Sequence, residues 1–158
     1  MKRAATVFLR VVLVLVAIGA LVLLLWEPQV EGVNAHATLV QIYFHDPFLA
    51  YMYVASIPFF TGLYQAFKVL GYVGRGELFS PSAVKSLRTI KYCAMAIIGF
   101  VALGEVFILS QESDDHAGGV AVGVMIIFAS AVVATAMSVL EHSLQNAVNM
   151  KSENDLTV

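Results

Sequence analysis

The run GVAVGVMIIFASAVVATAMSVL, residues 119–140, contains no charged residue, and this run decides the fold class. A helix needs roughly 20 consecutive apolar residues to cross the hydrocarbon core of a bilayer. Three further stretches, 6–26, 47–73 and 92–110, are of comparable length and nearly free of charge. Of all 158 residues, 59% are hydrophobic and 13% are charged, whereas soluble domains average about 25% charged residues. The sequence therefore predicts an all-α integral membrane protein, a four-helix bundle.

The four predicted spans and a tail at 141–158 account for most of the chain, which predicts a single membrane domain, 1–158. No internal repeat, low-complexity run or separate soluble domain is visible in the sequence. The first span follows Lys2 and Arg3, as a signal peptide would, but its long apolar run is not followed by a cleavage site of the A-x-A kind. We expect this span to be retained.

The basic residues are distributed asymmetrically along the chain. They occur near the N-terminus, between 68 and 91, and in the C-terminal tail, and the connections 27–46 and 111–118 contain none. Connections rich in lysine and arginine stay on the cytoplasmic side. We therefore expect a multi-pass protein of the cell's inner (plasma) membrane with both termini in the cytoplasm. The nine basic residues are Lys2, Arg3, Arg10, Lys68, Arg75, Lys85, Arg88, Lys91 and Lys151.

Two helix starts can be read directly, at Asp46-Pro47 and at Ser80-Pro81. Asp and Ser cap helices well, and proline is favoured at the first helical position. In the outer connection, NAHATLVQIYF (residues 34–44) could form a short helix lying on the membrane surface. Pro58 should kink the second span, because it removes a backbone hydrogen bond to Val54. Such a helix is either merely bent or a gate.

Glu105 is the one carboxylate clearly inside a predicted span, about 9 Å below the outer surface at 1.5 Å per residue. Ionisable groups at such a depth are costly, and they are functional candidates by default. Two alternatives stay open: a transport or proton-coupling role, with His36 or His45 as partner, or a protonated side chain bonded to a tyrosine or serine. The outer connection could cap a cavity lined by Glu105 and by Tyr51 or Tyr53.

Basic residues recur every three positions at the start of the third helix, at Lys85, Arg88 and Lys91. This stripe is predicted to contact anionic lipid headgroups, and a cytoplasmic protein partner could use the same surface. Glu141, at the inner end of the fourth span, is predicted to form surface ion pairs with nearby cations.

Small residues predict close helix packing on two faces. The fourth span presents Gly119 and Gly123, and the third span presents a stripe at an i, i+3 spacing. These faces are expected to pack on each other, although the same spacing would serve a homo-oligomer. The stripe on the third span comprises Cys93, Ala96, Gly99 and Ala102.

Three histidines on the predicted outer side, His36, His45 and His116, are candidate metal ligands together with Asp46 and other acidic residues. They lie on two connections without a tight ligand spacing, and the depletion of lysine and arginine around them follows from membrane orientation alone. No histidine lies at mid-span, where haem would need one. A single cysteine rules out a relay that needs cysteine pairs. No metal, cofactor, nucleic-acid partner or catalytic residue is predicted, and the protein is expected not to be an enzyme.

The stretches LLLWEPQVEGVNAHATLVQIYFHDPFLAYMYVASIPFFTGLYQAFKVLG, AVKSLRTIKYCAMAIIGF and SLQNAVNMKSENDLTV together resemble a known family. It comprises small four-span bacterial membrane proteins grouped as a domain of unknown function. The resemblance covers essentially the whole chain and implies the topology and the membrane location. Some relatives are encoded beside a small helix-turn-helix regulator, which implies a link to regulation. The resemblance implies no catalytic residue.

Three functional hypotheses follow. The first is a non-enzymatic protein that binds a partner or senses the state of the envelope, through its basic face and small-residue faces. The second is a small transporter or channel component that uses Glu105 and the second span with Pro58. The third is a metalloprotein at the outer connections.

Overall fold

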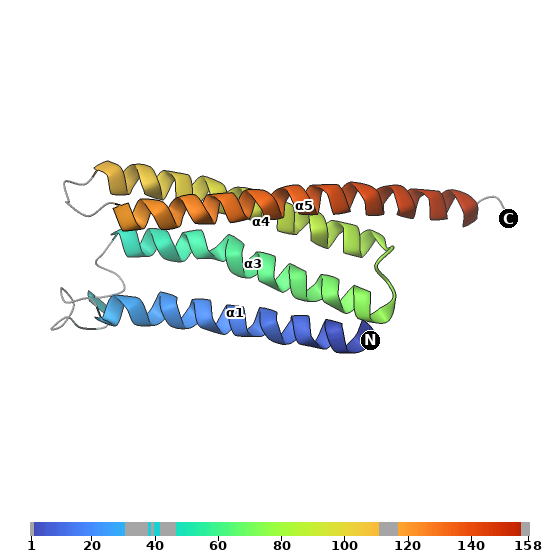
Figure 1. Cartoon of the computed structure of the whole chain (residues 1–158), viewed down its shortest axis with the longest axis horizontal. Coiled ribbons are helices and arrows are strands. Elements are labelled where there is room, and N and C mark those ends of the chain that lie inside the picture. The colour runs from blue at the N-terminus through green and yellow to red at the C-terminus, as the bar shows by residue number, and fades with distance from the viewer. Residues whose placement is uncertain (1, 31–37, 39, 42–46, 111–116, 156–158) are drawn as a thin grey trace.

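The computed structural model describes residues 2–30, 38, 40–41, 47–110 and 117–155, and it is a bundle of long helices (Figure 1). The helices are α1 (Lys2–Val30), α3 (Pro47–Arg75), α4 (Pro81–Ser110) and α5 (Ala117–Asp155). The prediction of an all-α membrane bundle is confirmed. Within the expected short outer helix, 34–44, Val40 and Gln41 are helical but Thr38 is not, and the other residues of that stretch lie outside the described ones. Figure 1 shows both termini and the α3–α4 connection at one end of the bundle.

The predicted helix starts at Pro47 and Pro81 are confirmed. The hydroxyl oxygen of Ser80 accepts a hydrogen bond from the backbone N–H of Ala83 at 3.3 Å, as an N-cap does. The connection between α3 and α4 begins at Gly76, which directly follows α3 and has a φ of +74°. Its N–H donates to the carbonyl of Val73, and that of Glu77 donates to Tyr72, which is the Schellman pattern. This pattern reverses the chain within five residues.

Pro58 lies inside α3, and the helix continues through it. The hydroxyl of Ser56 donates to the carbonyl of Tyr53 at 2.7 Å, and that of Thr61 donates to Ile57 at 2.8 Å. Neither hydroxyl bonds the carbonyl of Val54, which Pro58 leaves without its usual donor. Each bonds a carbonyl three or four residues before its own position, where a helical serine or threonine reaches most easily.

The helices pack in chain order and leave one side open. α1 packs on α3, α3 on α4 and α4 on α5, whereas α1 and α5 share no comparable contact among the described residues. On α1, the guanidinium of Arg10 lies 5.1 Å from the ring centroid of Phe67. A Cβ at Gly71 would lie 3.1 Å from its Nη2 atom. Arg10 thus lies against α3.

The tightest packing lies at the end of the bundle that carries the termini. Val84 and Leu87 of α4 and Leu144 of α5 form the buried cluster, with Val69 and Leu78 packed against it. Elsewhere large apolar side chains face outward, and Met125 and Phe128 are each 71% exposed. A water-soluble protein would bury such side chains, whereas lipid tails solvate them. The outward faces are therefore lipid-facing.

Three of the four helices are long and apolar enough to cross a membrane: Ala4–Trp26, Pro81–Ser110 and Gly118–Asn154. The fourth expected span, 47–73, lies in α3, which is 29 residues long but is not one of these three helices. The tyrosines, the two prolines and Lys68 of α3 lower its mean hydropathy. α5 has 39 residues and rises about 58 Å, roughly twice the thickness of the hydrocarbon core. Its C-terminal part therefore extends beyond the bilayer, and Figure 1 shows α5 reaching past the other helices.

A carboxylate held by two cations joins α4 to α5 directly after the apolar run 119–140. Glu141 accepts a hydrogen bond on Oε1 from Arg88 Nε at 2.6 Å and another on Oε2 from Lys91 Nζ at 2.5 Å. The Glu141 side chain is only 11% exposed, whereas that of Arg88 is half exposed. Glu141 was predicted to form ion pairs on the surface; the ion pairs are present, but the carboxylate is buried. Two members of the predicted basic stripe thus serve an intrachain contact, and Lys85 remains exposed.

We predict that Glu141→Gln lowers the melting temperature of the purified protein in detergent. The substitution replaces two charge-assisted hydrogen bonds, and a loss of about 1 kcal/mol corresponds to roughly 2–4 °C. Glu77→Gln is the matched control, because its ion pair with Arg75 is more than half exposed on both sides and should contribute little. Equal melting temperatures for the two variants would contradict the structural importance of the buried carboxylate.

The same contact should make stability depend on pH. Lys91 and Arg88 hold the pKa of the Glu141 carboxyl below its usual range by their hydrogen bonds to it. A carboxylate whose pKa is lower in the folded state stabilises the protein above its unfolded pKa, about 4.3, and this stabilisation is lost as the pH falls through the folded value. The difference in melting temperature between wild type and Glu141→Gln should therefore be constant near pH 7 and vanish in strong acid. A difference that grows on acidification would contradict this assignment.

Candidate functional site

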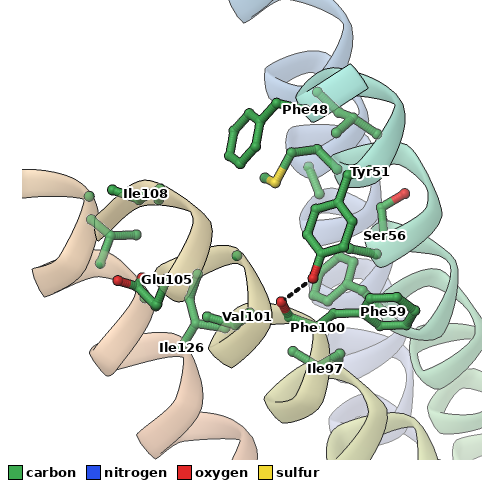
Figure 2. A pocket seen from close by; sticks show the side chains of 18 of the residues that line it. Phe48, Tyr51, Ser56, Phe59, Ile97, Phe100, Val101, Glu105, Ile108 and Ile126 are labelled. Carbon is green, nitrogen blue, oxygen red and sulfur yellow. Dashed lines mark hydrogen bonds between the residues drawn. The ribbon is translucent and has the colours of Figure 1, made fainter. Parts of the chain in front are cut away.

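The end of the bundle opposite the buried cluster is hollow. A cavity of about 460 Å³ lies among all four helices (Figure 2), within the range of small-molecule sites. Its wall is almost entirely apolar: α1 contributes aliphatic side chains, α3 mainly aromatic ones, and α4 and α5 aliphatic side chains and glycines together with Phe100. Glu105 is the only acidic residue of the wall within the described part of the chain. Residues from each helix include Leu24, Phe59, Phe100, Glu105 and Ile126.

The carboxylate of Glu105 occupies a notch in α5 made by a glycine. A Cβ at Gly123 would lie 1.5 Å from Glu105 Oε1 and 2.5 Å from its Cδ, so any side chain there would have to displace the carboxylate. Glu105 Oε2 is buried and has no hydrogen-bond partner among the described residues. Figure 2 shows Glu105 on the side of α4 that faces α5.

This arrangement is energetically unfavourable without a further partner. A charged side chain within a spanning segment is costly, and such groups pair with one another or with backbone carbonyls. No lysine or arginine of the described residues forms an ion pair with Glu105. Lys91, the nearest cation along α4, is fourteen positions away, about 21 Å at 1.5 Å per residue. A charged partner for Glu105 would therefore have to come from outside the described residues.

The opposite wall of the cavity is aromatic and fixed by packing. The hydroxyl of Tyr51 on α3 donates a hydrogen bond to the backbone carbonyl of Phe100 on α4, drawn as a dashed line in Figure 2. The two rings meet edge to face with centroids 5.9 Å apart. Phe48 stacks on Phe107 with centroids 5.4 Å apart. The Tyr51 ring also packs on Gly104 of α4, where a Cβ would make ordinary van der Waals contact with the ring at 3.5 Å.

The sequence-predicted site residues fall into three groups. Glu105 and Tyr51 meet at the cavity, as expected, and Pro58 lies in the helix that forms its aromatic wall. Arg88 and Lys91 lie at the other end of the bundle with Glu141. His36, His45, Asp46 and His116 lie outside the described residues, so the proposed metal ligands and the suggested histidine partner of Glu105 are untested. Among the residues that the structure describes, no group of three or more His, Cys, Asp or Glu could hold a metal ion.

Sequence reasoning missed how the small residues are used. Gly119 and Gly123 do face α4, but they contact Ile108 and Glu105 rather than the predicted stripe. Gly99 has nothing within 4 Å of a Cβ position, and Ala102 is exposed. The prediction that the stripe packs on α5 is therefore wrong for these two residues. Cys93 instead packs on Gly62 of α3, at 3.5 Å from the Cβ position there. Spacing identified the small faces but could not identify their partners.

Comparisons with known proteins identify the family. A family model described as "Protein of unknown function (DUF2975)" matches residues 31–158. The chain is 43% identical over 160 residues to "Uncharacterized membrane protein YoaS" of Bacillus subtilis (strain 168), with 100% of each chain covered. No solved structure matches the chain. The family expected from the sequence is thereby confirmed: this chain belongs to the DUF2975 family of membrane proteins.

Proposed function

We propose that this protein is a non-enzymatic regulatory membrane protein that binds a small ligand in the cavity and signals its presence to a partner. The observation that supports this proposal best is the cavity itself, which is apolar, is shared by all four helices and contains the carboxylate of Glu105, one oxygen atom of which is buried. A small molecule that filled it would contact four helices at once. Ligand binding would therefore change how the helices pack.

The two ends of α4 and α5 are suited to different tasks. At the hollow end, Glu105 lies against Gly123. At the packed end, Glu141 ties α5 to Arg88 and Lys91, and α5 then continues for about fourteen residues. A shift of α5 at the cavity would be carried along a rigid helix to this extension. Ligand binding at one site can alter affinity at another only if the two states differ in contacts at both.

The partner would bind at the end of the bundle where the termini lie. We propose that this end is cytoplasmic and that the protein resides in the inner membrane, because lysine and arginine gather there. Lys85 is exposed at this end, and Arg88 is half exposed despite its bond to Glu141. They could bind anionic lipid or an acidic protein surface.

Native mass spectrometry of gently extracted protein tests ligand binding. Wild type should carry a bound small molecule that is released on collisional activation. Ala55→Leu, which adds volume inside the cavity, should carry much less of it. Ala50→Leu is the matched control, since Ala50 lies on the same helix but faces outward. A bare wild-type protein, or the same adduct in both variants, would contradict the proposal.

A transport function is the second candidate, and the position of Glu105 favours it. A carboxylate in a lipid-embedded cavity can bind and release protons or cations, as proton relays in transporters do. Pro58 lies in α3, the helix that forms the aromatic wall, and it removes one backbone hydrogen bond of that helix.

If the protein transports, proteoliposomes with wild type should show proton or cation flux that Glu105→Gln abolishes without loss of assembly. Gly123→Ala should also reduce the flux, because a methyl group there displaces the carboxylate without removing it. Gly118→Ala, a position with nothing within 4 Å, should leave the flux unchanged. Equal flux from wild type and Glu105→Gln would exclude this candidate and leave the regulatory function.

A further inference from the structure

We infer that the ligand of the cavity is a hydrophobic cation that reaches the site from the bilayer. This inference rests on the proposed function, since it names the chemical class of the ligand that the cavity binds.

The acidic side chain in the wall favours a ligand of positive charge. Glu105 is the one acidic side chain in the lining, and its Oε2 has no hydrogen-bond partner in the described part of the chain. The described lysines and arginines do not pair with it. A bound cation would supply the missing partner, and a charge pair is strongest where water is excluded.

The rest of the wall selects a hydrophobic ligand. The polar groups next to Glu105 are few, and the Tyr51 hydroxyl is already bonded to the carbonyl of Phe100. A strongly hydrated ion such as Na⁺ would find one carboxylate and no set of oxygens to replace its water shell. An organic cation needs no such shell. The aromatic rings of Phe48, Phe59 and Phe100 offer faces on which it could lie.

The open side of the bundle indicates how the ligand arrives. Leu23 and Leu24 of α1 and Val122 and Ile126 of α5 all line the cavity, yet α1 and α5 do not pack closely on each other. The lining between these helices therefore faces lipid. A molecule that partitions into the bilayer can reach Glu105 from this side without crossing the aromatic wall of α3.

Tetraphenylphosphonium and tetraphenylborate test the inference, because they are nearly identical in shape and opposite in charge. Saturable binding of each ion to the full-length protein in nanodiscs of zwitterionic lipid is measured by equilibrium dialysis, with empty nanodiscs subtracted. We expect wild type to bind the phosphonium and not the borate. Glu105→Gln should weaken binding of the phosphonium roughly tenfold or more, because one partner of a desolvated charge pair is removed.

Two control variants separate a site from a general effect of charge or folding. Glu77→Gln removes an exposed carboxylate at the other end of the bundle and should bind the phosphonium as wild type does. Gly123→Ala keeps the carboxylate but displaces it, so it should weaken binding even if Glu105→Gln fails to assemble. Gly118→Ala should have no effect.

The outcomes distinguish failure of the inference from failure of the proposed function. Equal binding of both ions, unaffected by Glu105→Gln, would overturn the cationic class while leaving a cavity that binds apolar ligands. Absence of binding by either ion would overturn the inference as well. In that case the native mass of the wild-type protein decides independently whether the cavity holds any ligand.

Discussion

In hydrocarbon, every backbone N–H and C=O must find its partner within the protein, and the rest of this structure depends on that constraint. Each unsatisfied group would cost several kcal/mol, so a chain with long uncharged runs must cross the bilayer as helices. The long helices follow from this requirement. Once the helices are fixed, what remains variable is how closely they approach, because lipid tails solvate apolar side chains as well as neighbouring helices do.

The distance between neighbouring helices differs between the two ends of the bundle. At one end Val84, Leu87 and Leu144 pack tightly, and Glu141 bonds to two cations. At the other end the same helices separate around a cavity whose wall includes a carboxylate without a partner in the described residues. A protein that needed only to be stable would gain by replacing Glu105 with an apolar residue. A costly group in the wall of a hollow region is typical of a binding site, and the proposed function rests on this contrast.

Glycines and the two glutamates illustrate how much the sequence could predict. Glu105 was identified from the sequence because a carboxylate within an apolar run is unusual, whatever the fold. Glu141 was assigned correctly to ion pairing, but its burial against Arg88 and Lys91 depends on how α5 packs on α4, and no local pattern shows this. Gly123 was recognised as a small residue for close packing. That its missing side chain makes room for Glu105 depends on the register between α4 and α5, which spacing within either helix does not contain.

The sequence by itself determined the helical class, the helix starts at Pro47 and Pro81, and the concentration of positive charge toward one side. These follow from hydrophobicity, capping and charge, which act on each segment separately. Tertiary structure alone decided that α1 and α5 remain apart, that Arg88 and Lys91 share one carboxylate, and that Glu105 faces a cavity. These features depend on the rotation and register of each helix against its neighbours. In a membrane those are set by the fit of side chains from distant parts of the chain, since hydrophobicity does not distinguish a lipid-facing surface from a helix-facing one.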